Sequence, residues 1–494
     1  MVLKIKRGFR AFCLCGIAVL TLAGGFGAAA ESYVSYVYDW NRRIVPSPTY
    51  YTAADAVYGA EAVGRDWENP MDIAAAGEVI ALLDNGRSGV GSCVYLMDRD
   101  FHLVRTIQSF ENDGKEDALS NAQGIFLTGD KLYVADTGNG RILVFSLEGE
   151  LLHEFGRPDT DMLEDSLNYQ PKKLAVDDAG RMYVVAVSVN QGLIELESDG
   201  SFLRYMGANA VRYNLIEYIW RAFSTEEQLE RMNLFVPTEY TNLSIDGKGF
   251  LFAVNGTSAD SLSDSSIVKR LNPKGNNVLK QNGYVPPVGD ILDGKIYSVM
   301  VDVDVHPSGV YALLDSISGR VFLYDPDGNL LSAFGGTGER EGLTQVPVAV
   351  CYSGDRLLVV DSFWKAVLQY DLTPYGESVQ SATALYETGA YEASAAQWRQ
   401  VLLYNANSDL AYTGIGKVAL RTGDYETAAD CFRLSEQRLY YSKAYKQYRR
   451  QQLGVYFPYV AVVLLILIAL LLIRKAFKRG KALLRKLSAG YEKQ

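Results

Sequence analysis

Aspartate recurs at one fixed place in a repeated pattern of this sequence. Asp84, Asp136, Asp315 and Asp361 each follow a short apolar run and precede a polar turn. A carboxylate at such a place accepts hydrogen bonds from backbone N–H groups that the turn leaves without strand partners. We therefore predict that these four residues cap turns rather than take part in catalysis.

Histidine and cysteine offer little chemistry. The three histidines are far apart in the chain: His102, His153 and His306. Such scattering does not predict a zinc centre. After residue 30 there are three cysteines, Cys93, Cys351 and Cys431, and no C-x-x-C motif, so neither a disulfide framework nor a zinc site is indicated. The common nucleophile, phosphate-binding and metalloprotease motifs are also missing, and we predict no catalytic residue.

These residues lie in a strand pattern that occurs six times between about residues 69 and 372. Each copy has three or four short strands joined by Gly-containing turns, and the copies at 124–156 and 304–335 both end on Phe-Gly. Such repeats are typical of propeller blades. We predict an all-β six-bladed propeller over 31–374. The last copy stops after its third strand, so residues 33–59 are expected to close the ring.

One insertion interrupts the repeats, at 208–236. It reads as two short helices, the second opened by Ser224 with Glu227 three residues later, a capping box. We expect it to cap the propeller or pack on a neighbouring domain. A lid over the propeller's mouth, or contact with a membrane or partner, is the alternative.

The turn sequences resemble the NHL repeat. Asp136, Asp315 and Asp361 match its Asp position, and Arg141 and Arg320 match the basic position that follows. Two copies depart from the pattern, with Ala186 and Asn255 in place of Asp. The resemblance implies the propeller fold, but it does not fix an activity, because propellers host lyases, lactonases and binding modules alike.

The sequence also resembles six-bladed propellers of the gluconolactonase superfamily, and this resemblance implies an enzymatic function. In that family the innermost strands hold a divalent cation with oxygen ligands. The candidate ligands here are Glu239, Asn242 and Asp302, which lie near the starts of expected innermost strands. Ca²⁺ or Mg²⁺ at that place could polarise a lactone carbonyl. The alternative function is therefore a metal-dependent hydrolase of lactones or related esters. If the protein is not such a hydrolase, no cofactor is expected. These residues would then bind another ligand or form hydrogen bonds with backbone groups of turns.

After Pro374 the periodicity becomes helical. Gly389, Tyr391, Ala395 and Trp398 recur 34 residues later as Gly423, Tyr425, Ala429 and Phe432. This spacing resembles tetratricopeptide repeats, in which small residues let paired helices approach and aromatic residues fill the space between them. We predict an α-helical solenoid over 378–453, with a further helix from about 436 as its cap.

The two ends predict a membrane protein. Residues 455–473 carry no charge over 19 positions, enough for one transmembrane helix. The tail 474–494 holds eight Lys or Arg and one Glu, which favours a cytoplasmic location. Residues 1–30 have the basic start, apolar centre and Ala-Ala-Ala end of a secretory signal. We expect a single-pass cell-membrane protein whose bulk is extracytoplasmic.

Composition narrows the partners. The net charge is −10 although both ends are basic, so the middle is strongly acidic and nucleic acid is an unsuitable ligand. The 33 tyrosines suggest carbohydrate as a possible ligand. Our leading hypothesis is a non-enzymatic binding or scaffold protein that holds a ligand, protein or peptide at the cell surface, as an accessory to a membrane transporter or envelope complex. A sensor role would need a partner, because the tail is short.

Overall fold

The computed structural model describes residues 33–87, 91–163, 168–208, 239–256, 267–292 and 295–491. The chain forms two compact units, residues 1–377 and 378–494. The expected secretory signal at 1–30 lies outside the described residues, and so does nearly all of the insertion at 208–236.

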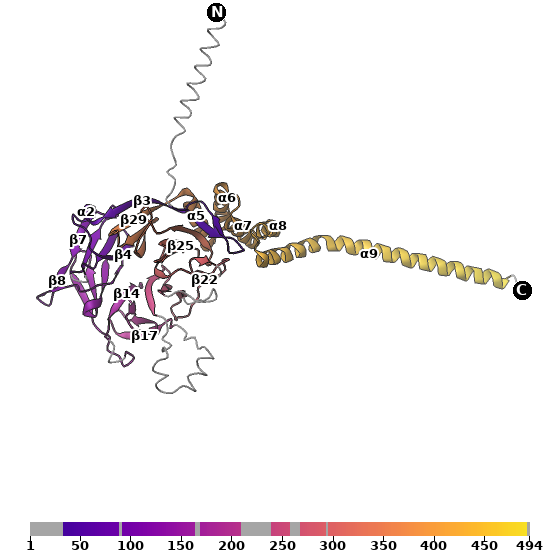
Figure 1. Ribbon diagram of the computed structural model, residues 1–494. Coiled ribbons are helices and arrows are strands. Elements are labelled where there is room, and N and C mark those ends of the chain that lie inside the picture. Colours follow the sequence, from indigo (N-terminus) through magenta and orange to yellow (C-terminus); the bar gives the residue numbers. More distant parts are fainter. Residues whose placement is uncertain are drawn as a thin grey trace, which may run out of the picture. The chain divides into compact units, whose positions relative to one another are not determined.

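Six antiparallel sheets in the first unit form a closed ring (Figure 1). The innermost strands are β4 (Pro70–Ala76), β10 (Gly124–Leu127), β14 (Pro171–Val176), β18 (Tyr240–Ile245), β23 (Met300–Val305) and β27 (Pro347–Ser353). Each contacts the next along the chain, and β27 contacts β4. The first unit is therefore a six-bladed β-propeller, which confirms the predicted fold class.

The strands that follow the innermost strand along the chain run outward in chain order, as expected for blades built from hairpins. In the first three blades the remaining strands are β5 (Val79–Asp84), β6 (Cys93–Met97) and β7 (Leu103–Ile107); β11 (Lys131–Asp136), β12 (Arg141–Ser146) and β13 (Leu151–Phe155); and β15 (Met182–Ala186), β16 (Leu193–Leu196) and β17 (Phe202–Met206). In the last three they are β19 (Leu251–Asn255) and β20 (Val268–Leu271); β24 (Tyr311–Asp315), β25 (Arg320–Tyr324) and β26 (Leu330–Gly335); and β28 (Arg356–Asp361) and β29 (Ala366–Leu372).

Short elements connect the blades. Two hairpins are formed by β8 (Ser109–Asn112) with β9 (Lys115–Ala118), and by β21 (Ile291–Leu292) with β22 (Lys295–Ile296). A 3₁₀ turn, η1 (Thr137–Asn139), follows β11, and a single helical turn, α2 (Gly59–Ala62), precedes the first blade.

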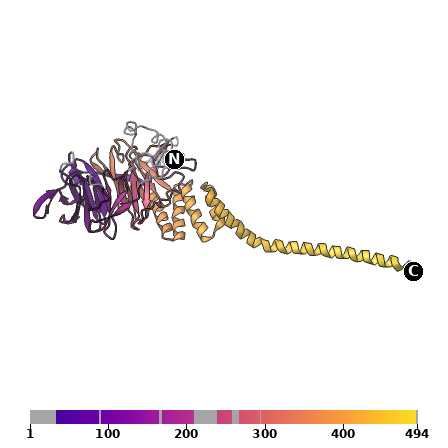
Figure 2. The same ribbon diagram turned by 90° about the horizontal axis from the view of Figure 1, so that it is seen from below.

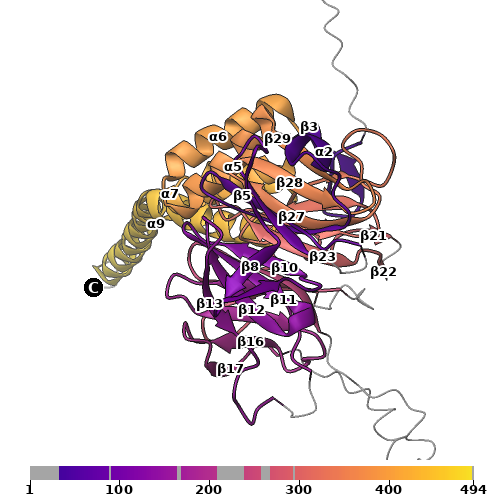
Figure 3. The ribbon, with the colours of Figure 1, turned by 90° about the vertical axis from the view of Figure 1, so that its left-hand side faces the viewer.

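The N-terminal segment supplies outer strands to two blades. β3 (Tyr51–Tyr58) pairs antiparallel with β29 along its whole length, from Leu372 opposite Tyr51 to Ala366 opposite Tyr58, so the sixth blade gains its fourth strand (Figure 3). The residues before β3 do not join the sixth blade, although the whole of 33–59 was expected to complete it. β1 (Tyr36–Tyr38) and β2 (Ile44–Pro46) extend the outer edge of the fifth blade, beside β26.

One carboxylate holds this early segment in place. Asp290 accepts hydrogen bonds from the hydroxyls of Tyr36 and Tyr38, and it forms an ion pair with Arg320 of β25. These contacts link β1 to Arg320 of the fifth blade.

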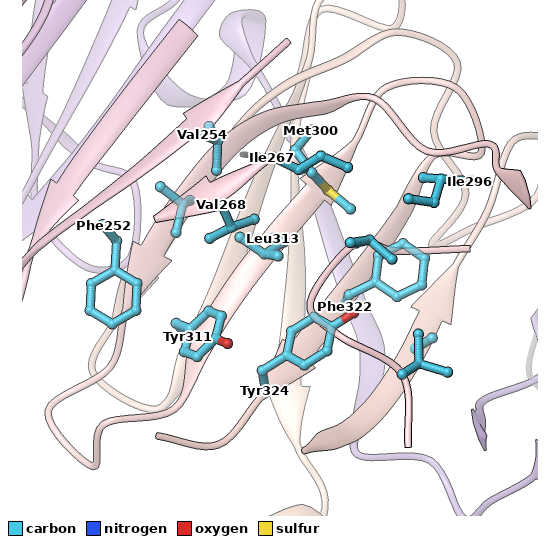
Figure 4. Close-up of a cluster of buried hydrophobic side chains, with 14 of the residues drawn as sticks. Phe252, Val254, Ile267, Val268, Ile296, Met300, Tyr311, Leu313, Phe322 and Tyr324 are labelled. Atoms are coloured by element: carbon cyan, nitrogen blue, oxygen red, sulfur yellow. The ribbon is translucent and has the colours of Figure 1, made fainter. Parts of the chain in front are cut away.

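The core of the propeller lies between neighbouring blades. Figure 4 shows the cluster between the fourth and fifth blades, where Phe252 faces Tyr311, with ring centroids 5.0 Å apart. Because each blade is covered on both faces, its central strands are apolar at successive positions; all five residues of β24 are buried.

The second unit is helical. Its helices are α5 (Pro374–Glu387), α6 (Tyr391–Tyr404), α7 (Asp409–Thr422), α8 (Tyr425–Leu434) and α9 (Arg438–Tyr491). Glycines let these helices approach closely: a Cβ added to Gly414 would clash with Trp398, and one added to Gly416 would lie 2.8 Å from the ring of Phe432. The 34-residue sequence repeat thus places equivalent aromatic side chains against small residues of α7.

Helix α9 continues without a break for 54 residues (Figure 2). Ala444 is the last of its residues that is packed into the helical core. Within the described residues, α9 is the one helix long and apolar enough to cross a membrane, over Arg438–Leu484. It contains Pro458 and no acidic residue.

Candidate functional site

The centre of the propeller receives one residue from each blade at the same register. In five blades a bulge follows the first residue of the innermost strand. The next paired residue of that strand lies opposite the residue before the repeat's Asp position, which is occupied by Ala186 in the third blade and by Asn255 in the fourth. Gly124 of β10 has the same register, opposite Ala135. We call these six residues the tunnel ring: Asp72, Gly124, Lys173, Asn242, Asp302 and Ala349.

The tunnel ring contains a buried ion pair. Lys173 Nζ lies 2.7 Å from Asp72 Oδ1, and the two side chains are only 9% and 7% exposed. The lysine needs the space that Gly124 leaves, because a Cβ on Gly124 would lie 3.0 Å from Lys173 Cδ and would clash with the carbonyl oxygen of Lys172. An ammonium group therefore neutralises one carboxylate in the centre of the ring.

The carboxylates of this region also connect neighbouring blades. Asp72 Oδ2 accepts a hydrogen bond from the backbone N–H of Ile125, at 2.8 Å, in the next blade. Asp302 does the same with Val350 at 2.7 Å, and Asp304 with Tyr352 at 2.8 Å. Asp304 also accepts from Ser244 Oγ, at 2.9 Å. These side chains satisfy backbone groups of innermost strands that would otherwise lack partners.

Burial changes the acidity of two of these groups. It raises the pKa of Asp302 well above its usual value; the nearby Asp72 carboxylate adds to this increase, and the Lys173 ammonium opposes it. Burial also raises the pKa of Asp304, although the hydrogen bonds from Tyr352 and Ser244 act to lower it. Both groups are thus harder to ionise than an ordinary aspartate, which weakens them as metal ligands, because a ligand carboxyl must first lose its proton.

The structure brings together two of the three residues predicted from the sequence. Asn242 and Asp302 both line a central cavity of about 80 Å³, together with Asp72, Lys173 and Asp304. Glu239 precedes β18, is exposed, and is not among the residues that line this cavity. Sequence reasoning missed Asp72, Asp304 and Lys173. Their signal is the register relative to the repeated Asp, which becomes visible only once the strands are paired.

The donor set does not fit Ca²⁺ or Mg²⁺, which need at least six oxygen ligands. Asp72 already has an ammonium group at 2.7 Å, and both oxygens of Asp302 accept backbone hydrogen bonds, from Val303 and Val350. Asn242 Oδ1 accepts from the N–H of Leu243, at 2.8 Å. A cavity of about 80 Å³ holds a few water molecules, whereas ligand pockets usually measure about 300 Å³ or more.

The repeated aspartates are turn caps, as predicted. Asp84, Asp136, Asp315 and Asp361 are all buried. Asp361 shows the pattern: it accepts from the N–H groups of Gln345 and Val346 before the blade, and of Phe363 and Trp364 in the turn. Arg141, at the basic position of the repeat, pairs with Asp136 at 2.8 Å.

A second cavity, of about 530 Å³, lies between the first and sixth blades. Both of its arginines form ion pairs: Arg356 Nε is 2.8 Å from Asp371, and Arg99 is 3.4 Å from Glu78. Because charges of both signs line this cavity, it does not indicate a class of ligand.

The three histidines have separate environments. His102 pairs with Asp98 at 3.0 Å, His153 stacks on Phe155, and His306 lies 3.3 Å from Asp355. In the described residues no group of three or more His, Cys, Asp or Glu is arranged to hold a metal ion. Burial raises the pKa of Cys93 to about 11, so this thiol is a poor nucleophile.

Comparison with known proteins adds no function. No known protein-family model and no curated protein sequence matches the chain. Among solved structures, a streptogramin B lyase is similar at 10% identity and a TM-score of 0.37, over 63% of this chain and 85% of the lyase. A protein of unknown function from Bacteroides thetaiotaomicron is similar at 12% identity and a TM-score of 0.42, over 69% of this chain and 76% of that protein. A putative gluconolactonase is similar at 11% identity and a TM-score of 0.38, over 69% of this chain and 98% of the gluconolactonase.

These scores carry no functional argument, and the assignment of the fold stands on the pairing of the strands. The chain is a six-bladed β-propeller protein with C-terminal helices, one of them long and apolar.

Proposed function

We propose that this protein is a membrane-anchored, extracytoplasmic scaffold that holds a ligand or protein partner at the cell surface, as an accessory to a transporter or envelope complex. The observation that supports this most strongly is the continuity of α9. The same helix packs Ala444 into the helical core and then carries 23 uncharged residues, 451–473. The helices would thereby be held next to the bilayer by the anchor itself.

The proposed orientation places the tail in the cytoplasm. Both ends of the apolar stretch are basic, but the end after it is more so: residues 474–486 hold seven Lys or Arg, and residues 438–450 hold five. The excess favours a cytoplasmic tail under the positive-inside rule. The secretory signal expected at 1–30 favours the same orientation.

Protein or peptide binding suits the second unit better than catalysis suits the first. The 34-residue repeat resembles tetratricopeptide repeats, which bind polypeptides, and two leucines of this unit are unusually exposed, Leu403 at 77% and Leu439 at 85%. In the propeller, the Lys173–Asp72 ion pair lies in the centre, and the cavity there measures only about 80 Å³. Carbohydrate binding has weaker support, because many tyrosines are buried in the core, among them Tyr95, Tyr311 and Tyr324.

Chemical cross-linking followed by purification of the full chain in detergent tests the proposal. We expect a defined partner with the wild type, and its loss when Leu403→Glu and Leu439→Glu are combined, since an exposed apolar contact would become charged. The control is Leu203→Glu in β17 of the propeller, a leucine that is 43% exposed. A wild-type chain that yields no stable partner, or a double variant that keeps it, would contradict the scaffold role.

The alternative function is the metal-dependent hydrolase of lactones or related esters. Asn242 and Asp302 share the central cavity, and this is the observation in its favour. Ca²⁺ or Mg²⁺ would have to displace the ammonium of Lys173 from Asp72. Lactone hydrolysis that depends on Ca²⁺ or Mg²⁺ and is lost on Asp302→Asn would establish this function, and its absence from purified wild-type protein would reject it.

A further inference from the structure

Helix α9 is cationic on both sides of its apolar stretch. Its 54 residues include no Asp or Glu. The first group of basic residues is Arg438, Lys443, Lys446, Arg449 and Arg450; the second is Arg474, Lys475, Lys478, Arg479, Lys481, Arg485 and Lys486. The preceding helices are acidic, with seven Asp or Glu against four Lys or Arg in residues 378–437. The first basic group therefore differs sharply from the rest of its unit.

Three residues of the first group share one face of the helix. Lys446, Arg449 and Arg450 are followed by Leu453, so the spacing is i, i+3, i+4 and i+7. All four side chains are exposed. The packing of α9 against the other helices ends at Ala444, so this part of the helix has left the helical core. We call Lys446, Arg449 and Arg450 the basic face.

The basic face lies at the depth of lipid headgroups if the apolar stretch spans a bilayer. The 23 uncharged residues between Arg450 and Arg474 extend about 35 Å at 1.5 Å per residue, close to the roughly 30 Å of a hydrocarbon core. Arg450 and Arg474 then reach the two headgroup layers. Lys446 is one turn farther out, within a Debye length of about 8 Å. Tyr445 and Tyr448 lie beside it, as aromatic residues do at membrane interfaces.

We propose that the basic face binds the phosphate groups of anionic phospholipids in the outer leaflet. This inference rests on the proposed single span and adds a specific lipid class to it. Guanidinium and ammonium groups donate charge-assisted hydrogen bonds to phosphate oxygens, and no acidic residue of α9 competes for them. Each basic residue near an anionic surface strengthens binding by about five-fold. The acidic middle of the chain lacks this attraction, so we expect the propeller to bind no anionic lipid.

The test measures lipid selectivity beside the basic face. The full chain carrying a fluorophore at Gln447→Cys is reconstituted in nanodiscs of phosphatidylcholine with a small, equal fraction of spin-labelled phosphatidylglycerol or phosphatidylcholine. Gln447 is exposed, and the native Cys93, Cys351 and Cys431 are buried, so labelling is specific in the described chain. We expect the phosphatidylglycerol quencher to be at least five-fold more effective, with the preference reduced in 1 M salt, where screening shortens to about 3 Å.

The ratio of quenching by phosphatidylglycerol to quenching by phosphatidylcholine should fall to about one when Lys446→Gln, Arg449→Gln and Arg450→Gln are combined. The control combines Lys248→Gln, Lys274→Gln and Lys295→Gln, three exposed lysines of the propeller, and should keep the wild-type preference. Equal quenching by both lipids in the wild type, or an unchanged preference in the basic-face variant, would overturn the inference. A basic face that instead cross-links to an acidic protein, with no lipid preference, would also overturn it. A chain that alkaline carbonate washes off membranes would refute the span itself, which is a separate outcome.

Discussion

At the scale of single residues, the tunnel ring depends on Lys173. This lysine is the counter-ion of Asp72 and lies close enough to Asp302 to influence its acidity. Lys173→Met keeps much of the side-chain volume but leaves a buried carboxylate without its partner. We expect a loss of about 3–5 kcal/mol in the free energy of unfolding, measured by denaturant titration of the full chain in detergent.

The exposed Lys248→Met is the matched control and should change stability by less than about 0.5 kcal/mol. Adding Asp72→Asn to Lys173→Met should recover part of the loss, because the carboxylate charge is then removed as well. Additive losses in the double variant would contradict the ion-pair account.

His306 should make stability depend on pH. The N–H of Ser308 donates to His306 Nδ1, at 3.1 Å, so the neutral ring fits this site. Burial lowers the pKa of His306, although the Asp355 carboxylate opposes this. The unfolded ring titrates near pH 6.5 and binds the proton more readily than the folded one. The stabilisation by neutral His306 is thus present above about pH 6.5 and is lost as the pH falls below it.

The measurement is the unfolding midpoint between pH 7.5 and pH 5. We expect it to decrease in the wild type as the pH falls, and to decrease less in His306→Gln, because the glutamine side chain at position 306 does not titrate. The same pH dependence in both proteins would show that His306 is not its source.

Residue-scale prediction from the sequence succeeded where the interaction is local. The turn-capping role of Asp361 follows from its own neighbours in the turn, because two of its four donors lie within three residues. The pairing of Lys173 with Asp72 joins two different blades, so no local pattern reveals it. Glu239 was placed near the tunnel from its position before β18, and the exposed side chain shows that nearness in sequence to Asn242 was not sufficient.

At the scale of elements, the helical unit depends on close packing at glycine. Gly416→Ala would place a methyl group 2.8 Å from the ring of Phe432, which is fully buried. We expect a local destabilisation of about 1–3 kcal/mol, read as faster amide hydrogen exchange in α7 and α8. Gly454→Ala is the control, because nothing lies within 4 Å of the added carbon. Unchanged protection in Gly416→Ala would contradict this packing.

Strand and helix patterns predicted most elements, and the exceptions have a physical reason. Long alternating repeats predicted six blades, and the 34-residue spacing predicted the paired helices. The assignment of β1 and β2 to the fifth blade was not predicted. Strands of three residues carry little pattern of their own, and their place depends on the distant Asp290 and Arg320.

At the scale of the whole molecule, the chain has a propeller with a small central cavity, of about 80 Å³, and a helical unit that ends in an apolar helix. The small size of this cavity favours binding at surfaces over chemistry in the tunnel. The uncharged stretch of α9 and its basic ends favour a single span. The central claim is therefore that residues 455–473 cross the membrane with the propeller outside.

Protease treatment of intact cells that express the chain with a C-terminal tag tests this claim most directly. We expect the propeller to be cleaved while a short tagged fragment, containing the end of α9, stays protected until the membrane is permeabilised. A tag that is digested in intact cells while the propeller is protected would reverse the orientation. A full-length chain that is protected until permeabilisation and is then released by alkaline carbonate would contradict the anchor.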